Sequence, residues 1–273
     1  MSQIKTSIAR KVLTFKSKQF ITPNYIRITL SGEVSDFKDA TVGDNNKIYI
    51  PPTGVDKVHF PVLDADTKKW IHAEKEIAPA VRTYTHKGVN LNTNELYIDF
   101  VNHGENGPAS AWAINAEVGD KLGVAMRTQP KQLYPSTSEW FLLVGDATAI
   151  PVLGAILESL PESAKGVCVI VVSSSEDIQQ LSTNASIEFT WIVEQDIHDE
   201  SKLVEAVKNI EIPSVPKFGY VACEFSAVKQ IRSYLRKELE WSSSELYAYS
   251  YWKQGVAEDR STADRQAEKK SIT

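Results

Sequence analysis

The chain is poor in the residues from which disulfide frameworks and metal centres are built. Among its 273 residues there are only two cysteines, Cys168 and Cys223, and five histidines. Two cysteines fit a reducing compartment better than a disulfide scaffold. The histidines show no spacing typical of metal ligands. We therefore expect a cytoplasmic protein without a protein-bound metal.

Long apolar runs and an excess of basic charge are also missing. No apolar segment approaches the roughly 20 residues that cross a bilayer, so we expect no membrane insertion. Residues 1–6 contain no apolar core of the kind found in secretory signals, so we expect no such signal. The formal net charge of -5 argues against general nucleic-acid binding. Hydrophobic residues make up 42% of the chain, which is enough for one large core or two ordinary ones.

The first half of the chain has the pattern of short β-strands. Residues 25–30 and residues 47–50 alternate apolar and polar side chains, which is the period of a half-buried strand. Several short strands separated by turn residues are typical of a small antiparallel barrel or sandwich. We expect an antiparallel β-barrel over residues 1–130. Its other strands are expected at residues 81–85, 96–101 and 122–126.

The composition changes between residues 128 and 138, where Gln, Pro, Ser and Thr dominate. Beyond this linker, continuous apolar runs alternate with helical stretches, which predicts an α/β domain with a parallel sheet covered by helices on both faces. Such sheets bind nucleotides at the carboxyl ends of their strands. We expect this domain at residues 137–252 and a polar C-terminal tail at 253–273. The expected strands are 140–144, 167–172, 187–193, 219–223 and 246–251, and the expected helices include 149–160 and 226–239.

A group of four residues on one expected strand, Arg82 to Thr85, combines a cation, a phenol ring and two hydroxyls. On a strand, Arg82 and Tyr84 face one way, and Thr83 and Thr85 face the other. A guanidinium suits a pyrophosphate, and a tyrosine ring can stack on a planar heterocycle. An ordinary barrel strand with surface Arg and Tyr gives the same four residues, so this motif is weak by itself.

Residues 103–110 form a glycine-containing turn that leads into an expected helix. Gly104 and Gly107 allow the backbone to approach an anion closely. Pro108 suits the first position of the helix, where the free amide groups that follow would face the anion. A polar loop between a strand and a helix explains the same residues equally well.

A second turn from strand to helix lies at residues 145–151. Gly145 follows the apolar strand, and a helix is expected to begin near Thr148, with Pro151 in its first turn. Such a turn is a place for a nucleotide phosphate or a nicotinamide. It lacks the three-glycine dinucleotide fingerprint, so the pattern alone is weak.

Taken in order, these motifs resemble the siderophore-interacting protein family, whose members are FAD-dependent ferric-siderophore reductases related to ferredoxin–NADP reductases. The resemblance extends from about Arg10 to Gly255. It implies a two-domain, ferredoxin reductase-like fold in which an FAD-binding barrel precedes an α/β NAD(P)-binding-like domain. It also implies reduction of ferric iron in a siderophore to release Fe(II), with NADH, NADPH or reduced ferredoxin as the electron donor. The motifs that carry it are Arg82-Thr83-Tyr84-Thr85, Asp99-Phe100-Val101, His103-Gly104, Gly107-Pro108-Ala109-Ser110, Gly145-Asp146-x-Thr148-Ala149-x-Pro151 and Tyr251-Trp252.

The resemblance also implies roles for single residues. Arg82 would contact the FAD phosphates, Tyr84 would pack against the flavin, and Thr85 would approach the reactive flavin nitrogen. Tyr84 and Thr85 are thus the residues implied for catalysis. His103 and the amide groups of residues 107–110 would hold the pyrophosphate. The other positions implied for cofactor binding are Thr83, Phe100, Val101 and Gly104, with Gly145, Asp146 and Thr148 near the nicotinamide donor.

Basic residues that line the substrate cleft in the family match Lys47, Arg127 and Lys253 here. They would attract an anionic ferric siderophore, although solvated surface charges are the alternative reading. The chain departs from the family pattern where Lys87 replaces a second arginine and Ala147 replaces an acidic residue.

Three further questions stay open from the sequence. Cys223 stands where many relatives have glycine, and it either lies near the nicotinamide or fills a strand end, whereas Cys168 is expected in the core. The flavin could also serve another acceptor, such as a ferredoxin, oxygen or free flavin. Finally, the chain could bind a ferric siderophore without reducing it.

Overall fold

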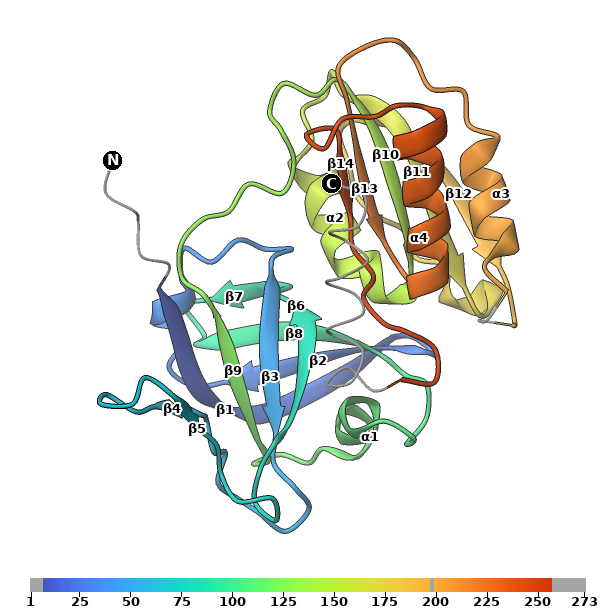
Figure 1. Ribbon diagram of the computed structural model, residues 1–273. Coiled ribbons are helices and arrows are strands. Elements are labelled where there is room, and N and C mark those ends of the chain that lie inside the picture. The colour runs from blue at the N-terminus through green and yellow to red at the C-terminus, as the bar shows by residue number, and fades with distance from the viewer. Residues whose placement is uncertain (1–6, 197–198, 257–273) are drawn as a thin grey trace. The chain divides into compact units, whose positions relative to one another are not determined.

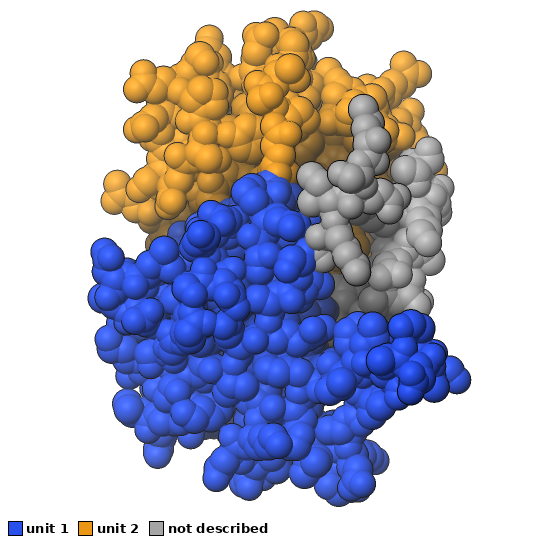
Figure 2. All heavy atoms as spheres, turned by 90° about the vertical axis from the view of Figure 1, so that its left-hand side faces the viewer, with its two compact units in different colours: residues 1–131 blue, residues 132–273 orange. Residues whose placement is uncertain are grey.

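The computed structural model describes residues 7–196 and 199–256, and the greater part of the expected polar tail therefore lies outside the described residues. The chain divides into two compact units, residues 1–131 and residues 132–273, which Figure 2 colours separately. The division falls inside the linker rich in Pro, Ser and Thr.

In its described residues, 7–131, the first unit contains a curled antiparallel sheet of seven strands, with the order β6-β3-β9-β1-β2-β8-β7 (Figure 1). The expectation of an antiparallel barrel is confirmed in the form of a half-barrel. A short hairpin of two strands, β4 and β5, inserts between β3 and β6 along the chain. The elements of this unit are β1 (Ile8–Thr22), β2 (Tyr25–Ser31), β3 (Asn45–Ile50), β4 (Val62–Leu63), β5 (Trp70–Ile71), β6 (Ala80–Thr85), β7 (Gly88–Asn90), β8 (Glu95–Val101), α1 (Pro108–Asn115) and β9 (Lys121–Arg127).

The core of the first unit follows directly from the alternation of its strands. Ile28 of β2 lies opposite Ile98 of β8, and both side chains are fully buried. Their neighbours two residues away along each strand are buried as well, because successive side chains point to opposite faces of a strand. Each such side chain contributes about 1.5–3 kcal/mol through burial. Ala113 of α1 packs into the same core, which holds the helix against the sheet.

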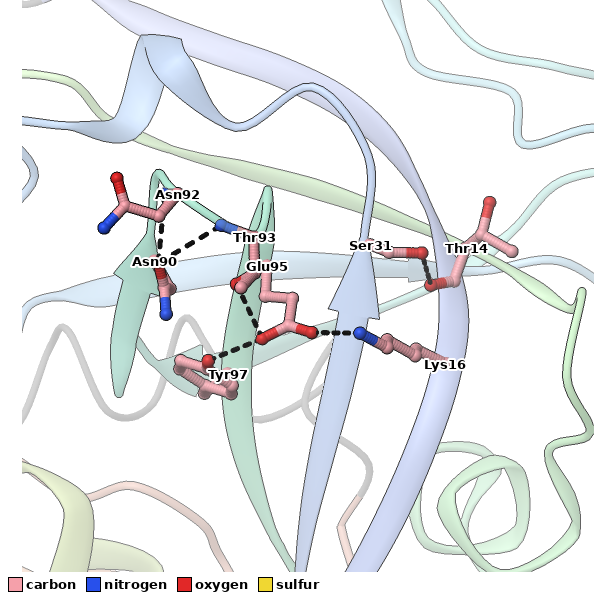
Figure 3. Close-up of polar contacts among 8 residues, drawn as sticks. All are labelled: Thr14, Lys16, Ser31, Asn90, Asn92, Thr93, Glu95 and Tyr97. Carbon is pink, nitrogen blue, oxygen red and sulfur yellow. Dashed lines mark hydrogen bonds and ion pairs between the residues drawn. The ribbon is translucent and has the colours of Figure 1, made fainter.

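A polar network ties the turn between β7 and β8 to β1 on the outside of the barrel (Figure 3). The Glu95 carboxylate accepts hydrogen bonds from the hydroxyls of Thr93 and Tyr97, both at 2.8 Å, and forms an ion pair with Lys16. These hydrogen bonds lower the pKa of Glu95 to about 2, and the bond from Lys16 has the largest effect, ahead of those from Tyr97 and Thr93. Asn90 accepts from the Thr93 amide and so shapes the turn itself.

The described part of the second unit contains a parallel sheet of five strands, with the order β12-β11-β10-β13-β14. All four strand pairs are parallel, which confirms the expected α/β class. Helices cover both faces of this sheet (Figure 1). Its elements are β10 (Trp140–Asp146), α2 (Ile150–Ser159), β11 (Lys165–Val172), β12 (Ser186–Val193), α3 (Ser201–Lys208), β13 (Lys217–Ala222), α4 (Phe225–Ser233) and β14 (Leu246–Ala248).

Three element boundaries differ from those expected. A 3-10 turn at Ala147–Ala149 comes before α2, so the strand continues through Asp146 and the helix begins at Ile150. The helix expected at 226–239 is α4 followed by a π-helical turn over Tyr234–Glu238. The strand expected at 246–251 ends at Ala248, although the amide of Tyr251 still bonds to the carbonyl of Cys223. These differences occur at the ends of helices and strands, where the local sequence pattern is least informative.

No helix among the described residues is long and apolar enough to span a membrane.

Candidate functional site

Residues 82–85 lie on β6, the strand at one edge of the described seven-stranded sheet, where β3 is its antiparallel partner. The expected alternation is present. Tyr84 points to the core side, where its ring lies 4.4 Å from the ring of Phe100, centroid to centroid. Thr83 is exposed on the opposite face. The Arg82 guanidinium donates to the carbonyl of Val81 at 2.8 Å, which holds its stem along the strand.

Two neighbouring residues of β8, Asp99 and Phe100, make different contacts, and only Phe100 packs against Tyr84 of β6. Phe100 is fully buried between Tyr84 and Trp112, so its ring backs the tyrosine from within the core. The neighbouring Asp99 carboxylate accepts two hydrogen bonds from the Arg27 guanidinium, at 2.7 and 2.9 Å. This paired arrangement occupies the carboxylate and makes it a structural link between β2 and β8. Val101, the last residue of β8, is half-buried.

The turn at residues 103–107 leads into α1 and is shaped by two glycines. Gly104 has a φ of +81°, in the left-handed region that favours glycine. A Cβ atom on Gly107 would lie 2.9 Å from Cε1 of His103, so the histidine ring packs directly over the glycine. The amide of His103 donates to the buried hydroxyl of Ser110 at 3.2 Å, which fastens the turn to the helix.

The N-terminus of α1 has no side-chain cap. Gly107 is the N-cap residue and offers no side-chain acceptor, and Pro108 occupies the first turn as expected. The amide of Ala111 bonds to the carbonyl of Gly107, and this leaves the amides of Ala109 and Ser110 as the first-turn donors. Such a helix start offers backbone N–H groups and a positive dipole to an anion.

Two buried polar side chains, which the sequence reasoning missed, lie beside Tyr84. Asn46 of β3 is directly opposite Tyr84 in the register, and His86 follows β6. Both are 1% exposed, and within the described ranges neither polar atom of Asn46 and neither ring nitrogen of His86 has a hydrogen-bond partner. Burial lowers the pKa of His86 to about 4, against the opposing effect of Asp44. A signal was present in the sequence, because Asn46 occupies an inward position of a strand whose next inward residue is Ile48.

These features fit a flavin dinucleotide on the first unit. The uncapped N-terminus of α1 and the Arg82 guanidinium suit the pyrophosphate of the dinucleotide, and the Tyr84 ring suits its planar ring system. The unpartnered polar atoms of Asn46 and His86 suit a ligand with polar groups of its own, since such atoms are costly to leave unpaired.

In the second unit, the turn after β10 is held by internal contacts. A Cβ atom on Gly145 would lie 2.5 Å from the Cβ of Ala149 and 3.0 Å from the carbonyl oxygen of Ala222. The Asp146 carboxylate accepts from the amide of Thr148 at 2.8 Å, from its hydroxyl, and from the indole nitrogen of Trp252 at 2.7 Å. Desolvation raises the pKa of Asp146 despite these bonds. The close contacts of Gly145 therefore explain why this position is a glycine. The hydrogen bonds to Thr148 and Trp252 explain why the next residue is an aspartate.

The strand end at Cys223 is part of the same arrangement. Cys223 is 1% exposed in the core of the second unit, and burial raises the pKa of its thiol well above the usual value. This agrees with the reading in which it fills a strand end. Cys168 is fully buried, as expected, with a thiol pKa raised to about 12 by desolvation. The neighbouring Glu224 caps α4 and accepts from the amide of Gln254.

The basic residues expected at the substrate site are found in two places. Lys47 of β3 pairs with Ala125 of β9, so Lys47 and Arg127 share the outward face of neighbouring strands. Lys47 donates to the hydroxyl of Thr83, and Arg127 lies 3.5 Å from the buried carboxylate of Asp44. Lys253 belongs to the second unit, and its ammonium group lies 4.8 Å from the centre of the Phe225 ring.

Comparison with known proteins identifies the class of protein to which this fold and site belong. The family model described as "Siderophore-interacting FAD-binding domain" matches residues 14–130, and the model described as "Siderophore-interacting protein" matches residues 138–255. A ferredoxin NADP+ reductase from Neisseria gonorrhoeae, solved with bound FAD and NADP, shares the fold. Its TM-score is 0.58 at 12% identity, with 89% of this chain and 99% of that chain covered. The chain is thus a two-unit protein of the ferredoxin reductase-like fold whose first unit is an FAD-binding domain.

The relatives then define the family. Ferric vibriobactin reductase ViuB from Vibrio cholerae is 30% identical over 262 residues, which is 95% of each chain. An NADPH-dependent ferric-chelate reductase from Escherichia coli is 27% identical and covers 92% of this chain and 95% of its own. The crystal structure of the siderophore-interacting protein SipS from Aeromonas hydrophila has a TM-score of 0.80 at 26% identity, covering 96% and 98%. This chain belongs to the siderophore-interacting protein family.

Proposed function

We propose that this protein is an FAD-dependent oxidoreductase that reduces ferric iron bound to a siderophore and so releases it as Fe(II). The observation that carries the proposal is the site on the first unit, where the strand of Arg82 and Tyr84 lies beside buried polar side chains that have no hydrogen-bond partner within the described ranges. That unit matches an FAD-binding domain of siderophore-interacting proteins. Two relatives that cover nearly all of this chain bear the names ferric vibriobactin reductase and NADPH-dependent ferric-chelate reductase.

On this proposal, the first unit binds and orients the cofactor. Arg82 and the first amides of α1, with His103, neutralise the pyrophosphate. Tyr84, backed by the buried ring of Phe100, forms a rigid platform for the flavin. Thr85 is the last residue of β6 and is 6% exposed, and its hydroxyl is proposed to approach the reactive flavin nitrogen.

FAD, when bound, supplies a centre that takes two electrons from a nicotinamide and releases them singly to ferric iron. The residues of the chain need no acid or base on the iron side, because no proton has to reach the metal for its reduction. Their work is to hold the donor and acceptor in place. Ferrous iron is bound far less firmly than ferric iron by the hard oxygen ligands of a siderophore, so reduction releases it.

The acceptor is proposed to meet the outward face that carries Lys47 and Arg127. Ferric catecholates are anionic, and cations near the site raise their local concentration. Asp44 offsets part of the Arg127 charge, so we expect Lys47 to contribute more. Lys253 of the second unit is proposed as a further contact with the siderophore.

The electron donor is proposed to be NADPH, with NADH and reduced ferredoxin as alternatives. The proposal rests on the E. coli relative, which is named for its dependence on NADPH. The turn at residues 145–148 ends a central strand of the parallel sheet, which is the end at which such sheets bind nucleotides.

The test is an anaerobic assay of the flavin-loaded protein with each of the three donors and with ferric siderophores, oxygen, ferredoxin or free flavin as acceptors. We expect rapid reduction of ferric siderophores and slower turnover of the other acceptors. A protein that takes up no FAD refutes the proposal. Siderophore binding without oxidation of any donor would instead favour a non-enzymatic carrier.

The role of the basic face has its own test. Replacing Lys47 and Arg127 together by alanine is expected to raise KM for an anionic ferric siderophore about tenfold, and this effect should shrink at high salt. The exposed Lys38 of the same unit, changed to alanine, is the control for loss of a positive charge. Equal KM values in the double variant and the control would exclude this face as the acceptor site.

A further inference from the structure

The first unit contains an unusual pair of buried polar side chains next to the proposed flavin platform. Asn46 and His86 are each 1% exposed, and across the described part of the chain none of their four polar side-chain atoms has a hydrogen-bond partner. Burying such groups unpaired lowers stability, so their presence needs an explanation. Their neighbours Ile48 and Met126 belong to the apolar core of this unit and lie on the same inward face as Asn46.

The register places both side chains beside the flavin-binding strand. Asn46 is the cross-strand partner of Tyr84, and Cβ atoms of such partners are about 4.5–5.5 Å apart. His86 lies just beyond the end of this ladder, where its amide bonds to the carbonyl of Asp44 and its carbonyl accepts from the amide of Gly43. Residues 46 and 84, opposite each other in the ladder, point to the same face. Asn46 is therefore next to Tyr84 on its own face, and His86 is buried two residues further along the chain.

The chemistry of the two side chains limits what they can bind. An asparagine amide presents a donor and an acceptor side by side in one plane, and a neutral imidazole has one of each. A pyrophosphate is only an acceptor, and the benzenoid edge of a flavin is apolar. The pyrimidine edge of a flavin matches, because its N3–H donor is flanked by two carbonyl acceptors.

We propose that Asn46 pairs with the flavin N3–H and an adjacent carbonyl, and that His86 bonds to a further polar atom of the same pyrimidine edge. The inference rests on the proposed function, because it takes the flavin to be seated at Tyr84. It assigns to Asn46 a positioning role that none of the sequence motifs contains. It also explains why a polar residue occupies an inward position of β3.

The test compares FAD with 3-methyl-FAD, in which a methyl group replaces the N3 proton. Both are titrated into apoprotein by flavin fluorescence, for the wild type, for Asn46→Leu and for Asn45→Leu. Asn45 is the matched control, because it is the same residue type on the same strand but is exposed. We expect the wild type and the control to prefer FAD by about tenfold or more, the value of one good hydrogen bond. Asn46→Leu should bind FAD about tenfold more weakly and distinguish the two ligands by less than threefold.

The stability of the apoprotein separates this role from a merely structural one. Leucine has the same number and branching of side-chain heavy atoms as asparagine and needs no partner, so Asn46→Leu should raise the Tm of the apoprotein or leave it unchanged. A structural asparagine would lower it. Wild-type discrimination between FAD and 3-methyl-FAD in Asn46→Leu, or a wild-type protein that binds the two equally, overturns the inference while leaving FAD binding intact. Failure of the wild type to bind FAD at all refutes the proposed function instead.

Discussion

The substitution of alanine for Gly145 provides a sharp test of how the carboxyl end of β10 is built. A Cβ atom there would lie 2.5 Å from the Cβ of Ala149 and 3.0 Å from both the Ala222 carbonyl oxygen and Cδ1 of Leu153. Carbon atoms in contact are normally about 3.5–4.0 Å apart. The turn and α2 must therefore move away from the sheet, and overpacking of this kind costs about 1–3 kcal/mol.

The matched control is the same substitution at Gly154, which lies inside α2. A Cβ atom on Gly154 would have nothing within 4 Å, and alanine is favoured over glycine within a helix by about 0.5–1 kcal/mol. Each kcal/mol corresponds to about 4 °C in Tm for a unit of this size. We therefore expect calorimetry of the apoprotein to show a fall of about 4–12 °C for Gly145→Ala and a rise of about 2–4 °C for Gly154→Ala.

A Gly145→Ala variant with the Tm of the wild type would show that the turn and α2 accept the added methyl group without overpacking, contrary to this expectation. If that variant also bound NADPH more weakly, the glycine would be required for close approach of the cofactor and not for packing of the helix on the sheet. A fall in Tm for Gly154→Ala would show that the space beside α2 is already filled. Faster hydrogen exchange of the amides in β10 would show that the second unit is the part of the protein that has been destabilised.

Three further predictions concern single side chains. Glu95 has a pKa of about 2 in the folded state against 4.5 unfolded, so its stabilisation is complete above about pH 4.5 and is lost as the pH falls towards 2. In urea unfolding, Glu95→Gln should lose this dependence on acid, and an unchanged profile would contradict the network of Figure 3. His86 has a pKa lowered from 6.5 to about 4, so the apoprotein should lose about 3 kcal/mol as the pH falls from 6.5 to 4. His86→Leu should remove that loss, and if it does not, another group titrates. Asp146→Asn should lower stability by about 1–3 kcal/mol in calorimetry, because it weakens the bonds to Thr148 and Trp252, and an unaltered Trp252 fluorescence would argue against that contact.

Much of the architecture was predictable because it depends on local periodicity. The alternation in residues 25–30 predicted a strand, and β2 occupies Tyr25–Ser31. The continuous apolar run from Trp140 predicted a buried strand, and every residue of β10 is buried. Pro108 predicted the start of a helix because its fixed φ and missing N–H are tolerated in the first turn. The extent of β14 was not predictable, since pairing with β13 decides where it ends.

The candidate site was predictable in part. The residues of β6 and of the turn before α1 stand out by composition. The structure shows the alternation of side chains along β6 and the uncapped N-terminus of α1 that this composition implied. The sequence did not reveal that the Asp99 carboxylate is paired with Arg27, because those residues are far apart in the chain. Nor did it reveal that Phe100 is fully buried behind Tyr84. The roles of the individual site residues in binding cofactor and substrate remain predictions.

The sequence alone determined the two-part organisation, the class of each part and the motifs that place the chain in a flavin-binding family. These follow from periodicity and from residue order, which need no knowledge of distant contacts. Only the tertiary structure decided that Gly145 is packed against Ala149, that Asp146 is bonded to Trp252, and that Asn46 faces inward beside Tyr84 with no hydrogen-bond partner for its amide among the residues described. Each of these depends on atoms from different elements meeting in space. Close packing leaves little freedom there, so the neighbours of a residue, rather than its type, determine its role.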